Sequence, residues 1–315
     1  MRTAFADTVR LLARDDPRVY LLTGDVGFGV FEPFAEEFPD RYINVGVAEA
    51  NLAGVAAGLA LSGKRPFIYS IGNFPTLRCL EQVRNDICYN AANVKIVSVG
   101  GGLSYGQLGA THHATEDLAV MRALPGMTVI APADPVETAL AVRAAYEHPD
   151  PVYLRLNRAG DPVVHRTAPE FRLGQAISVR SGNDVTLIAC GGIVPNALAA
   201  AEVLAAEGIE CSVLSMHTLK PIDAAAVLQA ASETGLIITI EEHSIVGGLG
   251  SAVSEVLTEA GGLGARLSRL ALPDAFSHLV GSQDYLRGAH GLSADGIAEH
   301  IKARLGSPWS IASGL

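Results

Sequence analysis

YINVGVAEANLAGVAAGLALSG, residues 42–63, is the stretch that decides the fold. A short apolar run, Tyr42–Val45, leads through a glycine into an alanine-rich segment, Ala48–Leu61, that is long enough for a helix. Gly54 and Gly58 lie on one face of that helix, where small residues let a second helix approach closely. A strand that runs directly into a helix is the building unit of a parallel α/β sheet.

The same alternation recurs along the whole chain. In the first half we predict strands and helices at Val19–Thr23, Tyr42–Val45, Ala48–Leu61, Pro66–Ile71, Leu77–Tyr89, Val94–Val99, Glu116–Arg122, Thr128–Ala131, Pro135–Glu147 and Val152–Leu156. A polar, proline-containing stretch follows, and the pattern then restarts at Val185–Ala189. We therefore predict two consecutive α/β domains with mainly parallel sheets: residues 1–165, a linker at 166–182, and residues 183–315.

The composition excludes several classes of protein. The 315 residues are 49% hydrophobic and 18% charged, enough to bury a core in each of two domains. The formal net charge of -10 argues against nucleic acid as a partner, because a phosphate backbone attracts a basic surface. The longest apolar stretch, Ala53–Leu61, is far shorter than the about 20 residues that a membrane span needs.

The cysteines and the N-terminal residues indicate where the protein works. No pair of cysteines has CxxC spacing, and none has the spacing of metal ligands; they are Cys79, Cys88, Cys190 and Cys211. The N-terminal residues lack the apolar segment of a secretory signal. We therefore expect reduced cysteines in the core and a cytoplasmic location.

Glu49 is the first candidate for chemistry. It lies in the first turn of the helix predicted after Tyr42–Val45. A carboxylate at that position can simply complement the helix dipole. Alternatively, it is a buried carboxyl group that shares a proton with a ligand. The residues alone leave both interpretations open.

The second candidate is the loop that opens GGGLSYGQLGATHHATED, residues 100–117. Its glycines allow the backbone to approach a ligand closely, and His112 and His113 are possible proton donors or metal ligands. A metal site is the weakest option, because adjacent histidines point apart and no third ligand follows at a typical spacing. The structural alternative is a surface loop whose histidines cap a helix. No phosphate-binding glycine motif occurs here.

Motifs in one order along the chain resemble the C-terminal two-thirds of transketolase. They are TGDVG at Thr23–Gly27, NVGVAEAN at Asn44–Asn51, GATHH at Gly109–His113, PADPVET at Pro132–Thr138, LRLNRAG at Leu154–Gly160, DVTLIACG at Asp184–Gly191, KPID at Lys220–Asp223 and EEHSIVGGLGSAVSEVL at Glu241–Leu257. The resemblance implies a pyrimidine-binding domain followed by a transketolase C-terminal domain, with thiamine diphosphate as the cofactor.

The resemblance also implies roles for single residues. In the family, the glutamate matching Glu49 faces the aminopyrimidine and favours the tautomer whose exocyclic nitrogen removes the thiazolium proton. His112 matches a substrate-contacting histidine and is expected to act in catalysis. His113 stands where the family has glutamine and is expected to bind substrate beside it. Asp25 matches an aspartate near the cofactor, although a lone acid after a strand can also cap a turn. Phe74 is the candidate ring for stacking on the pyrimidine, with an ordinary core residue as the alternative.

One element of thiamine enzymes is missing from this sequence. The family holds the diphosphate through Mg²⁺ with a Gly-Asp-Gly motif and a later asparagine, and no such motif occurs here. We therefore expect no metal ligands in this chain, and a partner, an N-terminal transketolase subunit, that carries them. The resemblance implies a heterotetramer with two subunits of each kind.

The phosphate end of the substrate site departs from the family. A serine, a histidine and an arginine grip the phosphate there, and the matching residues are Gly29, Gly100 and Arg158. Leu108 replaces an aspartate that accepts a hydrogen bond from a sugar hydroxyl. We therefore expect Arg158 to bind substrate in a split transketolase that transfers a two-carbon ketol unit between sugars or sugar phosphates other than the standard pentose-phosphate pair.

Two other functions stay open at this point. The β subunit of a 2-oxoacid dehydrogenase, or of a thiamine-dependent decarboxylase or deoxyxylulose-phosphate-synthase-like enzyme, shares both domains and the glutamate. Such an enzyme would release carbon dioxide from a 2-oxoacid. A non-catalytic subunit would only regulate a true transketolase. The GATHH segment and the motifs of the second domain favour transketolase or deoxyxylulose-phosphate synthase over the dehydrogenases.

Overall fold

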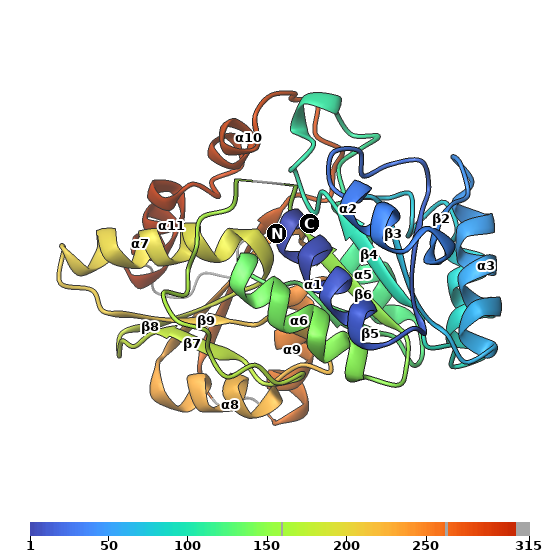
Figure 1. Ribbon diagram of the computed structural model, residues 1–315. Helices are drawn as coiled ribbons and strands as arrows, with labels where there is room; N and C mark the ends of the chain where they lie inside the picture. The colour runs from blue at the N-terminus through green and yellow to red at the C-terminus, as the bar shows by residue number, and fades with distance from the viewer. Residues whose placement is uncertain (159, 262–263, 307–315) are drawn as a thin grey trace.

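Two sheets organise the chain in the computed structural model, which describes residues 1–158, 160–261 and 264–306 (Figure 1). The first sheet has the strand order β10-β5-β6-β4-β3-β1-β2, and the second has the order β12-β11-β8-β9-β7. Within the described ranges, neighbouring strands are parallel except where β10 pairs with β5 and β7 pairs with β9. The predicted fold class, two α/β domains with mainly parallel sheets, is confirmed.

The elements fall mostly where the sequence predicts them. The strands are β1 (Val19–Thr23), β2 (Tyr42–Asn44), β3 (Arg65–Ile71), β4 (Lys95–Val99), β5 (Thr128–Ile130), β6 (Val152–Leu156), β7 (Ile177–Arg180), β8 (Val185–Ala189), β9 (Cys211–Ser215), β10 (Thr218–Lys220), β11 (Leu236–Ser244) and β12 (Arg266–Leu272). The helices are α1 (Arg2–Asp15), α2 (Glu32–Glu37), α3 (Glu49–Leu61), α4 (Leu80–Gln82), α5 (Asp117–Ala123), α6 (Pro135–Glu147), α7 (Val194–Ala205), α8 (Ala224–Glu233), α9 (Leu249–Glu259), α10 (Gln283–Ala289) and α11 (Ala294–Gly306).

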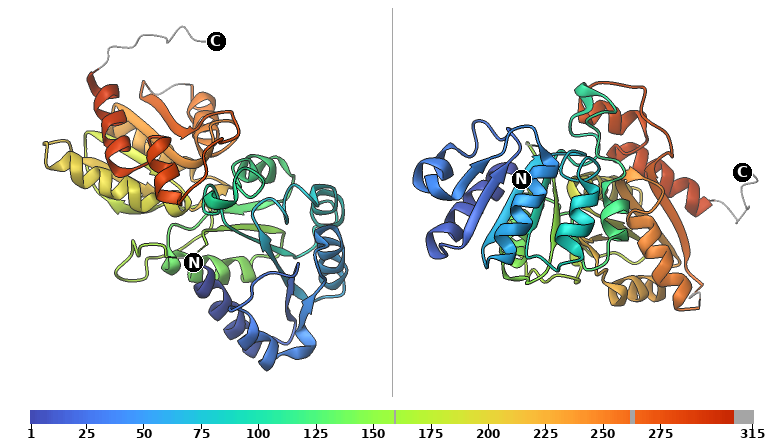
Figure 2. Two further views of the ribbon diagram at one scale, coloured as in Figure 1. Left: turned by 90° about the horizontal axis from the view of Figure 1, so that it is seen from above. Right: turned by 90° about the vertical axis from the view of Figure 1, so that its right-hand side faces the viewer.

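Helices cover both faces of each sheet, as the views in Figures 1 and 2 show. Helices α1 and α6 pack on one face of the first sheet, with Phe5 stacked on Tyr69 at a centroid distance of 5.7 Å. Helix α3 and a π-helical turn at Val83–Cys88 cover the other face, and their core continues into helices α8 and α9 of the second domain. Helices α7 and α11 cover the remaining face of the second sheet. Because one core is shared, the two domains are packed together.

Two short strands depart from the predicted organisation. Strand β7 falls inside the segment 166–182 that we expected to be a linker, and it forms the antiparallel edge of the second sheet. Strand β10 follows the second domain's β9 in sequence but pairs with β5 of the first sheet. A strand of three or four residues is too short to show a hydrophobic period, and the strands with which β7 and β10 pair lie far away in sequence. Such strands are therefore set by tertiary contacts.

Two features of the structure were predicted from the sequence: the state of the cysteines and the lack of a long apolar helix in the described ranges. All four cysteines are free and buried, as predicted. None of the helices in the described ranges combines the length and the apolar character needed to cross a membrane.

Candidate active site

Glu49 begins helix α3, directly after the turn that follows β2. Only 2% of the residue is exposed, so the carboxylate needs partners inside the protein. Its Oε1 accepts a hydrogen bond from Ser70 Oγ at 3.3 Å, and its Oε2 accepts one from Arg78 Nη1 at 2.9 Å. A Cβ added at Gly24 would lie 3.4 Å from Oε1, so the loop after β1 closes over the same carboxylate. Glu49 is therefore a buried and bonded carboxylate at the carboxyl ends of the parallel strands, where α/β sheets bind ligands.

Phe74 and Arg78 lie next to this carboxylate, on the segment between β3 and α4. The Cζ atom of Arg78 is 4.2 Å from the centroid of the Phe74 ring. The same guanidinium donates to Glu49, and 48% of its side chain remains exposed. A planar, nitrogen-bearing group is thus held between a carboxylate and an aromatic face. Phe74 is only partly buried, unlike a typical core phenylalanine.

A row of side chains continues from Phe74 to Arg158. The rings of Phe74 and His112 meet edge to face with centroids 5.4 Å apart, and the rings of His112 and Tyr105 are 6.5 Å apart. The Arg158 guanidinium lies 5.3 Å from the Tyr105 ring centroid. The structure therefore brings four residues predicted from sequence, Glu49, Phe74, His112 and Arg158, into one row.

Gly100 explains how Tyr105 reaches this row. Gly100 has φ +95, and a Cβ added to it would lie 2.2 Å from Tyr105 ring carbons. No side chain can stand there, because the Tyr105 ring fills the space. The glycine is a requirement of this local packing, because the edge of the Tyr105 ring takes the place of any side chain at position 100.

The other glycines of the run serve packing between the domains. A Cβ at Gly101 would lie 2.8 Å from Arg155 Nε, and one at Gly102 would lie 2.6 Å from Glu242 Oε1. Buried Arg155 donates to Asp117 Oδ2 at 2.9 Å, to Ala114 O at 2.7 Å and to Glu242 O at 2.9 Å. The close backbone approach expected at these glycines is thus to protein groups, and it fixes the loop that carries His112.

Asp25 lies after β1 with a left-handed backbone, φ 59. Its Oδ1 accepts a hydrogen bond of 3.0 Å from Asn44 Nδ2, and its backbone amide donates to Asn44 Oδ1 at 3.0 Å. Asp25 is exposed and adjoins Gly24, where an added Cβ would lie 3.4 Å from Glu49 Oε1. It therefore orders the ends of β1 and β2 beside the site, with its side chain already bonded to Asn44.

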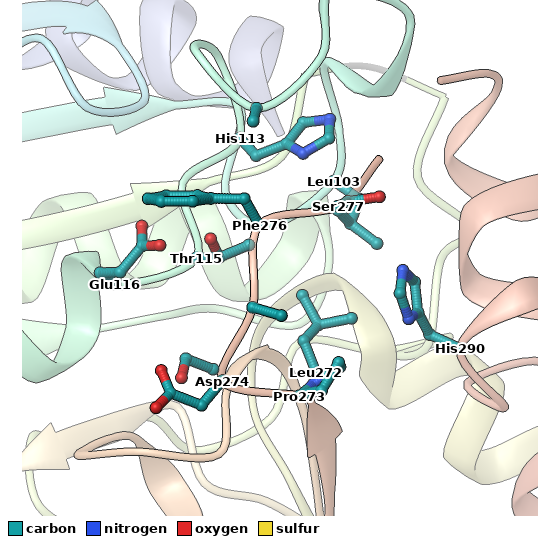
Figure 3. A pocket seen from close by; sticks show the side chains of 13 residues that line it. Leu103, His113, Thr115, Glu116, Leu272, Pro273, Asp274, Phe276, Ser277 and His290 are labelled. Atoms are coloured by element: carbon teal, nitrogen blue, oxygen red, sulfur yellow. The ribbon is translucent and has the colours of Figure 1, made fainter. Parts of the chain in front are cut away.

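His113 lies apart from the row although it follows His112. It is 3% exposed and lines a separate cavity of about 200 Å³ with Thr115, Glu116, Phe276 and His290 (Figure 3). Burial lowers the pKa of His113, which keeps the imidazole neutral near pH 7. The two adjacent histidines point to different places, as expected from the sequence.

Sequence reasoning missed Arg78, Ser70 and Tyr105. Each is ordinary by type and spacing, and each becomes informative only through a contact with a residue far away in sequence. The one available signal was the unbroken glycine run at 100–102, which indicates that something bulky packs there. Among the described residues, no group of three or more His, Cys, Asp or Glu side chains is placed to hold a metal ion.

Comparison with known families agrees with this arrangement. Residues 1–160 match the family described as transketolase, pyrimidine binding domain, and residues 174–297 match transketolase, C-terminal domain. A solved structure described as "Split gene transketolase, inactive beta4 tetramer" superposes with a TM-score of 0.89 at 39% identity, over 96% of this chain and 97% of that one.

Two curated relatives are transketolase subunits. The chain is 44% identical over 260 residues to a subunit of an apulose-4-phosphate transketolase from Phocaeicola vulgatus, covering 82% of this chain and 83% of that protein. It is 41% identical over 295 residues to a 6-deoxy-6-sulfo-D-fructose transketolase subunit from Clostridium sp., covering 93% and 91%. With both domains matched along most of their length, the chain belongs to the transketolase family.

Proposed function

We propose that this chain is the cofactor-activating subunit of a two-chain transketolase that transfers a two-carbon ketol unit between sugars. The observation that carries the proposal is the buried Glu49 carboxylate facing the Phe74 ring across a planar group. The subunit names of its relatives support transfer over the decarboxylation of a 2-oxoacid.

The residues present fit the aminopyrimidine of thiamine diphosphate. Arg78 acts as a stand-in for that ring, because its guanidinium is planar, donates to Glu49 and lies on Phe74. An aminopyrimidine would be bound through the same two contacts, a carboxyl group at a ring nitrogen and an aromatic face. When bound, thiamine diphosphate supplies the nucleophilic carbon for cleaving a ketose next to its carbonyl. Glu49 would hold and share the proton at the ring nitrogen.

His112 is placed to bind the substrate. Its Nδ1 lies 3.0 Å from Thr111 Oγ1, which fixes the ring and leaves Nε2 for a hydroxyl or carbonyl group. Arg158, at the far end of the row, is proposed to contact the distal part of the sugar. For Asp25 we propose an indirect part, ordering the loop over Glu49 through Asn44. The substrate role expected of His113 stays a prediction.

The partner completes the site in this proposal. We propose that Mg²⁺ and the diphosphate are held by an N-terminal transketolase subunit, in a cytoplasmic heterotetramer of two subunits of each kind. A relative whose solved form is described as an inactive beta4 tetramer supports the expectation that this chain alone is inactive.

Reconstitution tests the proposal. Each chain is assayed alone and then mixed with thiamine diphosphate and Mg²⁺, using hydroxypyruvate as donor and glycolaldehyde as acceptor. We expect ketol transfer only from the mixture. Transfer by the partner alone at the rate of the mixture would show that this chain is regulatory, and carbon dioxide release from pyruvate in place of ketol transfer would show a decarboxylase.

A further inference from the structure

A cleft between the two domains begins at the Arg158 end of the row and has a volume of about 500 Å³. Its walls come from the loop around Tyr105, from the segment after β6, and from the start of α10. Polar uncharged side chains predominate on these walls, among them Ser104, Gln107, Asn196, Ser282 and Gln283. A cleft of this size and polarity is suited to a sugar.

Two of the charged groups on these walls are already compensated within the protein. Arg287 is bound to the Glu242 carboxylate at 2.5 Å and to Gly192 O at 2.9 Å. The Asp161 carboxylate is paired with the N-terminal ammonium group of Met1 at 3.1 Å. Neither Arg287 nor Asp161 therefore offers an unpaired charge to a ligand.

Arg158 and Asp284 are the remaining charged side chains of the lining. In the part of the chain that the structure describes, Arg158 is left as a cation with no carboxylate partner, and its contact is the Tyr105 ring. The Asp284 carboxylate brings an opposite charge into the same cleft. One arginine in a cleft that also contains a carboxylate is a poor receptor for a phosphate dianion.

Tyr105 strengthens this selection. The edge of its ring occupies the space at Gly100, and the ring lies between His112 and the Arg158 guanidinium. Burial raises the pKa of Tyr105, so the phenol is neutral at physiological pH. The carbon atoms of the ring offer no N–H donor to a phosphate, but they pack well against the C–H groups of a sugar.

From this geometry we infer that the Tyr105 cleft is a subsite for the distal, unphosphorylated polyhydroxy end of the sugar substrate, and that Tyr105 is a specificity-determining residue. The inference rests on the proposed function and deepens it by naming the substrate class. Carbon atoms of the open-chain sugar would pack against the Tyr105 ring, while its hydroxyls would bind the Gln107 amide and Gln283 Oε1. The Nε2 of Gln283 is already bonded to Glu242, and Asn196 is bonded to Leu292 O and Arg287.

The test measures kcat/KM of the reconstituted pair for a ketose and for its phosphate ester, D-fructose and D-fructose 6-phosphate, beside the short donor hydroxypyruvate. We expect the unphosphorylated ketose to be preferred by at least about tenfold, which is the order that a few lost or repelled contacts produce. Tyr105→Ala should reduce that preference about tenfold or more, while Tyr105→Phe, which keeps the ring, should retain it.

Hydroxypyruvate has no distal chain, so the preference of each Tyr105 variant is read as the ratio of its two fructose rates, each divided by the hydroxypyruvate rate of the same variant. If the wild-type pair turns over hydroxypyruvate but prefers the phosphate ester, the inference about the cleft is wrong while the proposed function stands. If hydroxypyruvate is not turned over at all, the proposed function itself fails. A wild-type preference for D-fructose that survives in Tyr105→Ala would remove Tyr105 as its cause.

Discussion

Arg78 and Glu49 form an ion pair in which Nη1 lies 2.9 Å from Oε2, with the arginine half exposed and the glutamate buried. The same guanidinium covers the Phe74 ring at 4.2 Å. One flexible side chain therefore satisfies both groups that are proposed to bind the aminopyrimidine. Cofactor and Arg78 cannot occupy this position together.

The first prediction concerns this competition. Arg78→Gln in the reconstituted pair should tighten thiamine diphosphate binding about three- to tenfold, because Arg78 is half exposed and a cation–π contact or ion pair made by such a side chain is worth only a few-fold. Isothermal titration calorimetry measures the affinity directly. Arg84→Gln, which changes an exposed arginine on the π-helical turn after α4, is the matched control and should leave the affinity unchanged. Weaker binding in Arg78→Gln would mean that Arg78 holds the cofactor.

The second prediction concerns the buried ion pair of Arg155 and Asp117 in the first domain. Arg155→Met leaves the Asp117 carboxylate without its cation and should lower the free energy of unfolding by about 3–5 kcal/mol. Urea denaturation followed by circular dichroism measures this loss. The double variant Asp117→Asn with Arg155→Met should lose less than the two single variants added together. Additive losses would show that the two side chains do not stabilise each other.

The third prediction concerns pH. His165 Nε2 lies 2.7 Å from Glu137 Oε1, and this hydrogen bond, opposed by burial, raises the pKa of His165 above its usual value of 6.5. A raised folded-state pKa stabilises the protein fully below the unfolded pKa, and the contribution is lost as pH rises through the folded pKa. The difference in free energy of unfolding between wild type and His165→Gln should therefore be larger at about pH 5.5 than at about pH 8.5. A constant difference would contradict the assignment.

The parts of the structure that the sequence predicted are those with strong local patterns. Strands β1 and β6 and helix α6 have the predicted bounds, because apolar runs, Asp134 and Pro135 mark their ends. Glu49 was found through its position at the start of α3. Arg78 was not predicted as a site residue, because only its contacts with Glu49, 29 residues away, and with Phe74 place it in the site. Tyr105 became informative only with the backbone conformation of Gly100.

The division into domains was also predicted only in part, because it depends on contacts between distant segments. Two α/β domains follow from alternating strands and helices, but strand β10 crosses from the second half of the sequence into the first sheet. Lys220 Nζ supports that crossing by donating to Arg122 O at 2.9 Å and to Leu124 O. Which strand a three-residue segment joins depends on such distant partners, so no local pattern predicts it.

The fourth prediction addresses the central claim, that Glu49 activates the cofactor. Glu49→Gln keeps the size of the side chain but cannot share a proton as a carboxyl group does, so turnover of the reconstituted pair should fall about a hundredfold to ten-thousandfold. Size-exclusion chromatography should show the same assembly as the wild type, which excludes loss of the partner as the cause.

The most direct measurement is the rate at which the thiazolium C2 proton of thiamine diphosphate exchanges with deuterium in the assembled pair, followed by quenching and NMR. With wild-type chain the exchange should be accelerated over free cofactor, and with Glu49→Gln most of that acceleration should be lost while the cofactor stays bound. Equal exchange rates in the two assemblies would contradict the account.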